Sequence, residues 1–485
     1  MCRRILLWIV LVLLLSEGVA QATWQRAYGG YGISEGHGVR ETPDHGFIVV
    51  GCTGSFGNGS SDIYILKLDS LGERQWSRAI GGASIDQGWA VRNLPDGGYV
   101  IAGYTDAGAG RGFDGIVVKL NALGEPQWQH TYGLDGWDFL YDLEVLDDGF
   151  VVVGGTYRGG ASGEQAWVMK LDDNGGVLWE SILGNEDGTE ARSVIHASDD
   201  SLVVAGSWGL PDGSRDAFVA KYDLAGNVLW NSQVSEVGDN VCYSVVETTD
   251  GGYALGGFST QPTRRVMMLA KVNAGGAFQW INHIDGGTGA WEGRAIREDY
   301  GGGLVLSGIT TSYGAGEEDF YMARTDALGN WQSGPNFGTA YGDQCWGMDM
   351  VSDGGYVMVG STPGAGINVG SVYVVKNAGD VISSPLVVDF DPLGVQETSP
   401  SSALHLAPNP ATPGSTVSMG PSWALIKGWH AELFDLVGNS VARFQGGGQN
   451  TVEFQMPKLA AGSYIVRVLT ANAEILSARF VIKAE

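Results

Sequence analysis

The chain has 485 residues, of which 54 are acidic and 28 are basic, giving a formal net charge of −26 at pH 7. This length allows two or three domains. The acidic balance argues against nucleic-acid binding, because that function needs a basic surface to neutralise phosphates.

The first 22 residues have the pattern of a signal peptide. Arg3 and Arg4 precede the apolar run ILLWIVLVLLL, and Ala20 to Ala22 form a small-residue cleavage site. The run has only 11 residues, too few to span a bilayer comfortably, although an uncleaved anchor is the alternative. Cys2 precedes the run, unlike a lipoprotein cysteine. No later segment reaches spanning length, so we expect an exported mature chain without a transmembrane segment.

A repeat of 51 or 52 residues follows the signal peptide. DGGYVIAG at 96 to 103 returns as DGGYALGG at 250 and DGGYVMVG at 353, and Asp-Gly before an apolar run favours a hairpin turn. Seven such turns begin at Asp44, Asp96, Asp147, Asp199, Asp250, Gly301 and Asp353. A tryptophan marks the same period at Trp24, Trp76, Trp128, Trp179, Trp230, Trp280 and Trp331. A basic residue does so at Lys67, Lys119, Lys170, Lys221, Lys271, Arg324 and Lys376.

Each repeat predicts four short strands separated by Gly-rich or Asp-rich turns. The strands FIVVG, YVIAG and FVVVG are apolar throughout, which implies burial on both faces. Sheets buried on both faces are typical of propeller blades, each packed between two neighbours. The sequence therefore predicts an all-β fold with a seven-bladed β-propeller over residues 23–384.

The ends of the repeat array predict how the propeller closes. The last repeat lacks its tryptophan strand, whereas TWQRAYGG, from Thr23, is such a strand without a repeat before it. We expect this N-terminal strand to complete the seventh blade and remove an open edge. PLVVDF, residues 385–390, is the rival for that place.

Three cysteines follow the signal peptide, Cys52, Cys242 and Cys345. Their odd number and the absence of CxxC spacing predict neither a disulfide framework nor a zinc site. Cys52 and Cys345 belong to repeats that become neighbours when the ring closes, so a disulfide is one option. Buried free thiols are the favoured one.

Features that recur in every repeat are interpreted as structural. We expect the tryptophans to pack between blades, and Lys67 to pair with Asp69 on the same strand face. Side chains at the turn before each first strand can cap that turn by bonding the backbone two residues on, and calcium ligation is the weaker alternative. These residues are Ser34, Asp86, Asp138, Thr189, Asn240 and Asp343, with Trp291 as the exception.

Three residues further along, one position holds a large aromatic or cationic side chain in every repeat. The first strand of a propeller blade is innermost, so this column is predicted to lie at a mouth of the central channel. There it would form a ligand-binding ring, unless these side chains only fill gaps between blades. The column is His37, Trp89, Tyr141, Arg192, Tyr243, Arg294 and Trp346.

The segments LDSLGERQW and LDDNGGVLW resemble the blade motif of pyrroloquinoline-quinone-type propellers. Those enzymes typically have eight blades and an adjacent cysteine pair at the cofactor. This chain has seven repeats and no Cys-Cys, so no cofactor is predicted from the resemblance.

The tail follows a different plan from the repeats. Residues 385–403 are rich in Ser and Pro and predict a linker, and alternating strands over 404–485 predict a small Ig-like β-sandwich. This region resembles the C-terminal sorting domain of type IX secretion cargo in Gram-negative bacteria. An Ig-like accessory domain is the alternative. The resemblance rests chiefly on Pro408, Asn409, Pro410, Gly438, Gly462 and Tyr464, and implies an outer-membrane or secreted location with the secretion machinery as partner.

Two classes of function remain open. The favoured one is a non-enzymatic exported module that binds a glycan, peptide or protein at the channel mouth. The other is an extracellular polysaccharide hydrolase or lyase, with Glu35, Glu190 or Glu292 near the mouth as acids or bases. No known catalytic motif is present, and no catalytic residue or metal ligand is predicted.

Overall fold

The computed structural model describes residues 23–106, 108, 112–133, 136–157, 163–184, 187–364, 370–377 and 385–390, together with seven strands after residue 404. The predicted signal peptide, residues 391–403 of the predicted linker and residue 404 lie outside this part. Among the described residues, no helix has the length and hydropathy needed to cross a membrane.

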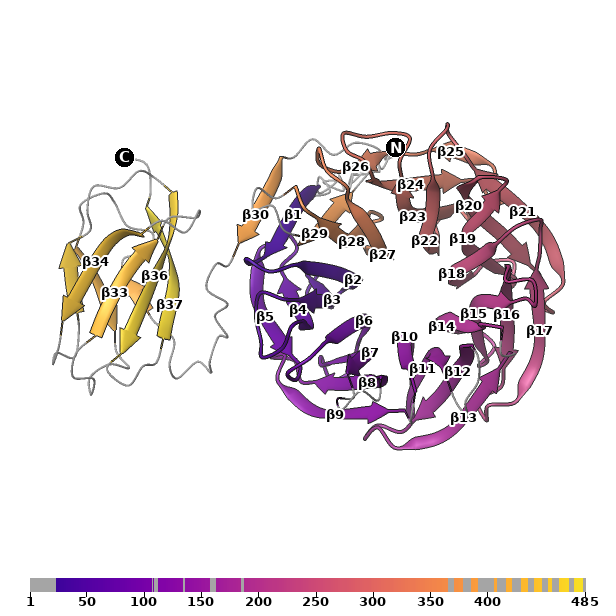
Figure 1. The fold of residues 1–485 in the computed structure, drawn as a ribbon, viewed down its shortest axis with the longest axis horizontal. Coiled ribbons are helices and arrows are strands. Elements are labelled where there is room, and N and C mark those ends of the chain that lie inside the picture. Colours follow the sequence, from indigo (N-terminus) through magenta and orange to yellow (C-terminus); the bar gives the residue numbers. More distant parts are fainter. Residues whose placement is uncertain are drawn as a thin grey trace, which may run out of the picture.

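Seven blades, each built on four antiparallel strands, surround a central channel, as the sequence predicts (Figure 1); blades 6 and 7 each have one additional strand. In each blade the first of the four strands is innermost and the fourth is outermost. Blades 1 to 3 are β2 (Ser34–Glu41), β3 (Phe47–Thr53), β4 (Asp62–Leu68) and β5 (Arg74–Ile80); β6 (Asp86–Asn93), β7 (Tyr99–Asp106), β8 (Phe113–Leu120) and β9 (Pro126–Tyr132); and β10 (Asp138–Leu146), β11 (Gly149–Thr156), β12 (Gln165–Leu171) and β13 (Val177–Leu183).

The remaining blades repeat this plan. Blades 4 to 6 are β14 (Glu190–His196), β15 (Leu202–Gly209), β16 (Arg215–Tyr222) and β17 (Val228–Val234); β18 (Asn240–Glu247), β19 (Tyr253–Gln261), β20 (Arg264–Val272) and β21 (Phe278–Ile284); and β22 (Trp291–Glu298), β23 (Leu304–Thr310), β24 (Asp319–Thr325) and β25 (Trp331–Ser333), with β26 (Asn336–Phe337) also on β24. Blade 7 contains β27 (Gln344–Met350), β28 (Tyr356–Thr362) and β29 (Ser371–Asn377).

The N-terminal strand closes the ring. Strand β1 (Trp24–Gly29) pairs antiparallel with β29, so Trp24 lies opposite Lys376. Its rival is also a strand: β30 (Leu386–Phe390) pairs parallel with the outer edge of β1, although the sequence analysis places these residues in the linker. Blade 7 therefore has five strands, because β1 leaves one edge that β30 covers.

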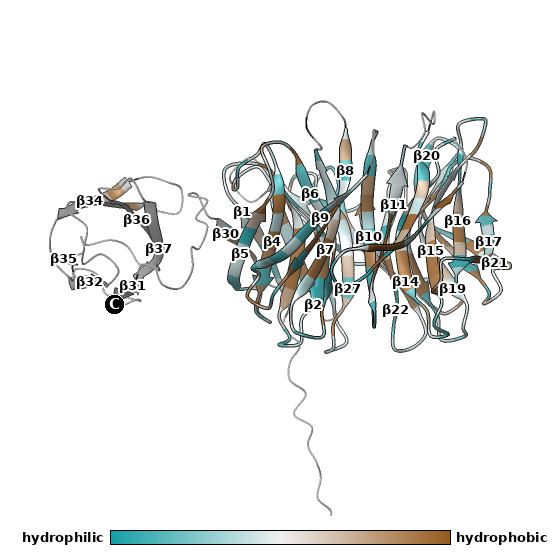
Figure 2. Cartoon of the chain, turned by 90° about the horizontal axis from the view of Figure 1, so that it is seen from below, coloured by the Kyte–Doolittle hydropathy of each residue, from teal (hydrophilic) through white to brown (hydrophobic). Residues whose placement is uncertain are grey.

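Buried hydrophobic clusters occupy all seven interfaces between blades. Strand β3 shows how one strand serves two of them. Phe47 and Val49 pack toward blade 7, whereas Ile48 and Val50 pack toward blade 2. Figure 2 accordingly shows hydrophobic segments within the strands and hydrophilic colours at many connecting loops.

The tryptophan marker packs against a glycine in the turn between the third and fourth strands of the neighbouring blade, which in blade 1 is LDSLG, residues 68–72. Trp24 lies over the turn of blade 1, where its Nε1–H donates to Ser70 O at 3.1 Å. Gly72 in that turn has φ +77°, and a Cβ there would come within 2.9 Å of the Trp24 ring. Glycine thus supplies both the left-handed turn and the space for the neighbouring indole. Trp331 is different: its side chain is 55% exposed, and its Nε1–H donates to Tyr321 Oη in its own blade at 3.2 Å.

The basic marker pairs with the hairpin turn. Lys67 Nζ lies 2.9 Å from Asp44 Oδ2, so the expected pair with Asp69 is wrong. Asp69 instead accepts hydrogen bonds from the N–H groups of Leu71 and Glu73 in its own turn. The side chain of Lys67 reaches back to the turn between the first two strands because both lie at the same end of the blade.

The C-terminal region forms two sheets. One has the order β31 (His405–Ala407), β32 (Thr416–Gly420), β35 (Val452–Gln455), and the other has the order β34 (Ser440–Gly446), β33 (Trp429–Phe434), β36 (Gly462–Thr470), β37 (Ile475–Ile482). Of the predicted sorting residues, Gly462 and Tyr464 lie in β36. Pro408, Asn409, Pro410 and Gly438 lie outside the described residues.

Candidate ligand-binding site in the central channel

A β-bulge places each member of the seven-residue column. In β2 the pairing with β3 passes from Gly36 directly to Gly38, so His37 is the extra residue. A bulge re-aims the side chain of the extra residue. The other six innermost strands have the same irregularity at Trp89, Tyr141, Arg192, Tyr243, Arg294 and Trp346.

The seven side chains form a closed ring of ring-stacking and cation–π contacts. His37 stacks on Trp89 with centroids 4.3 Å apart and planes 12° apart. Arg192 lies over Tyr141 at 3.7 Å, and Arg294 lies between Tyr243 at 4.4 Å and Trp346 at 4.5 Å. The remaining neighbours are Trp89–Tyr141 at 5.6 Å, Arg192–Tyr243 at 5.9 Å and Trp346–His37 at 6.0 Å. We call this layer of seven side chains the bulge ring; it joins all seven blades.

The bulge ring borders a channel cavity of about 860 Å³. The column lies at the middle of the innermost strands, deeper than the mouth at which the sequence analysis places it. Most other residues that line the cavity come one to three positions after a bulge residue in the sequence. The cavity therefore extends from the bulge ring to the mouth of the channel at the C-terminal ends of the innermost strands. This volume lies within the range of small-molecule sites.

Three residues beyond the bulge ring, a second set of side chains lines the cavity. It combines an ionic wall on blades 6, 7 and 1 to 3 with an apolar wall on blades 4 and 5. These residues are Arg40, Arg92, Glu144, Ile195, Val246, Arg297 and Asp349. This set was not predicted from the sequence, although the repeats differ visibly in charge three residues after the column.

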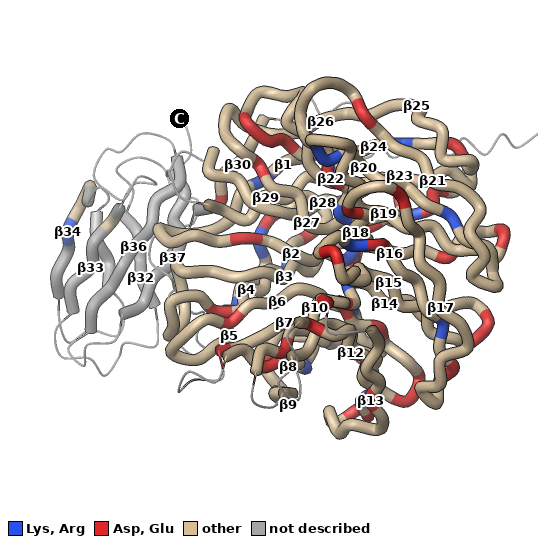
Figure 3. The backbone as a smooth tube through the Cα atoms, turned by 45° about the vertical axis from the view of Figure 1, so that its right-hand side comes forward, with Lys and Arg blue, Asp and Glu red and all other residues tan. Residues whose placement is uncertain are grey.

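Ion pairs connect the side chains of the ionic wall. Arg92 pairs with Asp142 at 2.9 Å and with Glu144 at 3.3 Å. Asp349 serves two arginines, Arg297 at 3.4 Å and Arg40 at 3.9 Å. Burial lowers the pKa of Arg40 to about 10, with nearby Arg92 adding to the effect. In Figure 3 acidic segments predominate over the propeller, with basic segments scattered among them.

Acidic side chains lie on the other side of the bulge ring. Glu190 pairs with Arg192 at 2.5 Å and with Arg215 at 3.0 Å. Glu292 pairs in the same way with Arg294 at 2.5 Å and with Arg265. Glu35 instead faces His37, with Glu35 Oε2 and His37 Nε2 3.6 Å apart.

A further carboxyl near this group has an unusual environment. Glu164 is 8% exposed, and its Oε1 accepts no hydrogen bond among the described residues. Gly155 makes room for it, because a Cβ there would come within 1.7 Å of Glu164 Oε1. Burial, followed by the nearby charge of Glu190, raises the pKa of Glu164 well above that of an ordinary glutamate.

The turn column is buried but bonds differently from the expectation. Asp86 Oδ2 accepts from Gly82 N at 2.7 Å and Asp343 Oδ2 from Thr339 N at 2.6 Å, four residues back rather than two on. A hydroxyl at the end of the second strand is the other partner, as in Ser34–Thr53 and Asn240–Ser259, both at 2.8 Å. Asp138 bonds Thr156 in the same manner, and Thr189 is fully buried.

Residues 405–483 match the family model of the secretion system C-terminal sorting domain. The chain ends in a secretion sorting domain. It marks the protein as type IX secretion cargo, which is secreted or displayed on the surface of a Gram-negative bacterium. No curated protein matches the chain.

Several solved structures resemble the propeller. They include Sqt1 from Chaetomium thermophilum, with 13% identity, coverage of 74% of this chain and 100% of that one, and a TM-score of 0.43. The Pan2 WD40 domain of Neurospora crassa has 12% identity, coverage of 74% and 92%, and a TM-score of 0.44. The β-propeller domain of the Trilobed protease from Pyrococcus furiosus has 12% identity, coverage of 73% of this chain and 93% of that one, and a TM-score of 0.42. Likenesses this low identify no ligand and no particular propeller family, so the resemblance to the pyrroloquinoline-quinone type stays a prediction.

Proposed function

We propose that this exported propeller is a binding module that takes an extracellular glycan or a peptide segment of a protein into the cavity beside the bulge ring. The observation that carries the proposal is the meeting of seven bulge side chains at one end of a ligand-sized cavity. Bulges cost strand pairing, and here one occurs at the same position in all seven innermost strands.

The chemistry of the ring suits such ligands. Trp89, Tyr141, Tyr243 and Trp346 supply aromatic faces, which stack on sugar rings and on planar or apolar groups. Arg40, Arg92 and Arg297 line the same cavity and carry N–H donors. A ligand with several oxygen atoms would accept hydrogen bonds from these arginines, and the apolar wall would contact its less polar face.

Glycan and peptide arrays, each paired with a turnover assay, test this proposal. We expect retention of a ligand class without turnover. Ile195→Glu places a charge on the apolar wall and should abolish retention, whereas Val237→Glu, at a side chain that is 94% exposed, should not. Retention that survives Ile195→Glu would contradict the assignment of the cavity.

Glu164 and Glu190 favour a second candidate, the polysaccharide hydrolase or lyase. Their environments differ as those of an acid and a base do: Glu190 is paired with two arginines, whereas burial keeps Glu164 protonated to higher pH. Turnover of a retained glycan that is lost in Glu164→Gln would establish this function in place of simple binding.

The domain plan remains part of the proposal: a signal peptide over 1–22, the propeller over 23–384, a linker over 385–403 and the sorting domain over 404–485. The two C-terminal sheets support an Ig-like β-sandwich for that domain. Strand β30 indicates that the linker begins after residue 390.

A further inference from the structure

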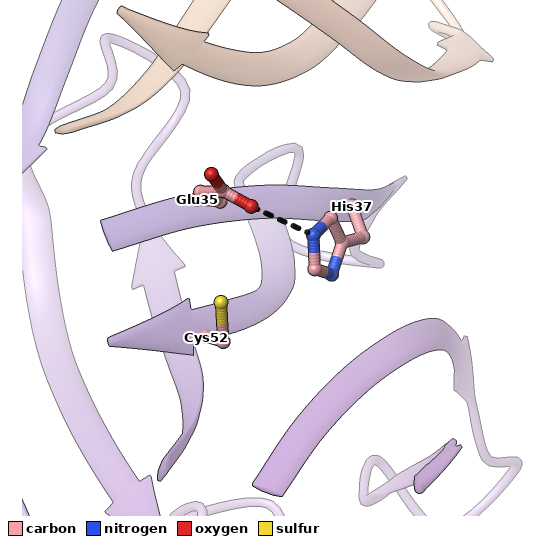
Figure 4. A group of neighbouring side chains, drawn as sticks. All are labelled: Glu35, His37 and Cys52. Atoms are coloured by element: carbon pink, nitrogen blue, oxygen red, sulfur yellow. Dashed lines mark ion pairs between the residues drawn. The ribbon is translucent and has the colours of Figure 1, made fainter. Parts of the chain in front are cut away.

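Three side chains with metal-binding atoms converge beside the bulge ring in blade 1. Glu35 and His37 lie on β2, and Cys52 lies directly opposite Glu35 on β3 (Figure 4). One carboxylate oxygen, one imidazole nitrogen and the thiol sulfur all lie within 4.8 Å of one another. His37 and Cys52 are each 5% exposed, whereas the Glu35 side chain is 37% exposed and reaches solvent.

The orientation of the imidazole is already fixed. His37 Nδ1 lies 2.8 Å from Gly88 O, and since a carbonyl only accepts, Nδ1 must carry the hydrogen. Stacking on Trp89 holds the plane of the ring. A backbone carbonyl that receives one ring N–H is the usual outer partner of a metal-bound histidine. The other nitrogen, Nε2, is thereby presented to Glu35 and Cys52.

The spacing of Glu35 and His37 suits a shared metal better than a hydrogen bond. Glu35 Oε2 and His37 Nε2 are 3.6 Å apart, beyond hydrogen-bond distance. Two ligands of a tetrahedral zinc, each about 2.0–2.1 Å from the metal, lie roughly 3.4 Å apart. Glu35 and His37 would therefore need only a small adjustment to share one ion, and the Cys52 thiol would have to approach it from within 4.8 Å of both.

The other blades provide an internal comparison. Glu190 and Glu292 occupy the same strand position as Glu35, and each is neutralised by two arginines. In blade 1 the bulge residue is an imidazole, and a thiol takes the cross-strand position. A bound dication would supply at Glu35 the positive charge that arginines supply in blades 4 and 6.

We propose that Glu35, His37 and Cys52 bind a zinc-class transition-metal ion. Thiolate and imidazole ligands select such ions, whereas calcium and magnesium require oxygen ligands. Three protein ligands leave a fourth position for water or for a donor atom of a bound molecule. The site goes beyond the proposed binding function, since it requires no occupant in the channel cavity.

Metal titration of the untagged, metal-stripped protein without its predicted signal peptide tests the site. We expect one equivalent of Zn²⁺ by calorimetry and, with Co²⁺, a thiolate-to-metal charge-transfer band. Cys52→Ser should abolish that band and, like Glu35→Gln, should weaken Zn²⁺ binding by more than the roughly 10–100-fold that loss of an outer partner costs. Cys242→Ser is the matched control, because Cys242 is also a buried free thiol and lies in blade 5.

Thermal melts of the metal-free variants separate loss of the site from loss of the fold. The half-exposed Glu35 offers a variant with little effect on packing. The proposal is overturned if the wild-type chain binds no stoichiometric Zn²⁺, if folded Glu35→Gln binds as tightly as wild type, or if Cys242→Ser loses the metal equally. None of these results depends on the glycan or peptide arrays.

Discussion

Lys271 Nζ lies 2.9 Å from Asp250 Oδ1, and this pair ties the third strand of blade 5 to the turn between its first two strands. The lysine side chain is 4% exposed, whereas the aspartate side chain is 62% exposed. The same pairing joins two of the three sequence markers in four other blades, as Lys67–Asp44, Lys170–Asp148, Lys221–Asp199 and Lys376–Asp353.

Removing the two charges of this pair should have unequal effects. Asp250→Asn keeps an oxygen for the N–H of Gly252 but leaves a buried ammonium without its counter-ion, so we expect a loss of about 1.5–3 kcal/mol in the free energy of unfolding. Lys271→Met should cost less, because the carboxylate left behind is accessible to water. Chemical denaturation measures both variants. A larger loss for Lys271→Met would contradict this account of the marker.

Glu164 should make stability depend on pH. Burial and Glu190 raise its pKa in the folded state, so the folded chain binds more protons than the unfolded one above the ordinary glutamate pKa of about 4.3. This contribution is fully present below that pH and is lost as the pH rises through the raised value. We expect Glu164→Gln to match wild type near pH 4 and to exceed its melting temperature near pH 8. Equal pH profiles would show that Glu164 is not held protonated.

The repeat made the propeller predictable, because each marker has the same structural role in nearly every blade. Gly97, at φ +84°, supplies the left-handed turn that DGGY predicts. His45 and Asp200 hold that conformation in blades 1 and 4, since histidine and aspartate tolerate it better than most residues. The displaced strand at Trp24 likewise predicted closure, because an unpaired blade edge needs a partner.

Pairing across strands was not predictable from the period alone. The bulges at the ring depend on register, so the sequence identified the column but placed it at the mouth of the channel. The partner of Lys67 is Asp44 in a turn 23 residues earlier, not Asp69, which lies in the turn after the strand. Glu35, His37 and Cys52 lack a metal-binding spacing because they meet across two strands.

The clasp should be essential to the propeller. Deleting residues 23–30 removes β1, including Trp24 and Tyr28, which are buried against blade 1, and strips β30 of its partner. We expect aggregation or a loss exceeding about 3–5 kcal/mol, the cost of removing one large buried aromatic. Deleting residues 385–390 should cost clearly less, because β30 adds one strand to the outer edge of β1 and one ion pair, from Asp389 to Arg74. Equal melting curves for the two deletions would contradict this order.

The sorting domain should act without the propeller. A periplasmic marker protein fused to residues 404–485 should cross the outer membrane in a host with type IX machinery. The matched control is the same fusion with residues 462–485 removed, which deletes β36 and β37. The marker should then stay in the periplasm. Export of both fusions would show that the signal lies elsewhere.

Two tryptophans of different columns test the central claim most directly. Trp346 belongs to the bulge ring, whereas Trp128 packs between blades 2 and 3 and donates to Asp173 O at 3.2 Å. Trp346→Ala, and likewise Trp89→Ala, should weaken retention of the ligand identified on the arrays by about 1–3 kcal/mol, by analogy with base–aromatic stacking, and leave the fold largely intact. Trp128→Ala should lower the free energy of unfolding by up to about 3–5 kcal/mol, the upper end applying to a fully buried aromatic, because Trp128 is partly buried. Trp346→Ala should therefore lower ligand affinity with little change in the free energy of unfolding, whereas Trp128→Ala should lower the free energy of unfolding. If Trp346→Ala destabilises the fold as strongly as Trp128→Ala and leaves ligand affinity unchanged, the bulge ring is packing and the proposed site is wrong.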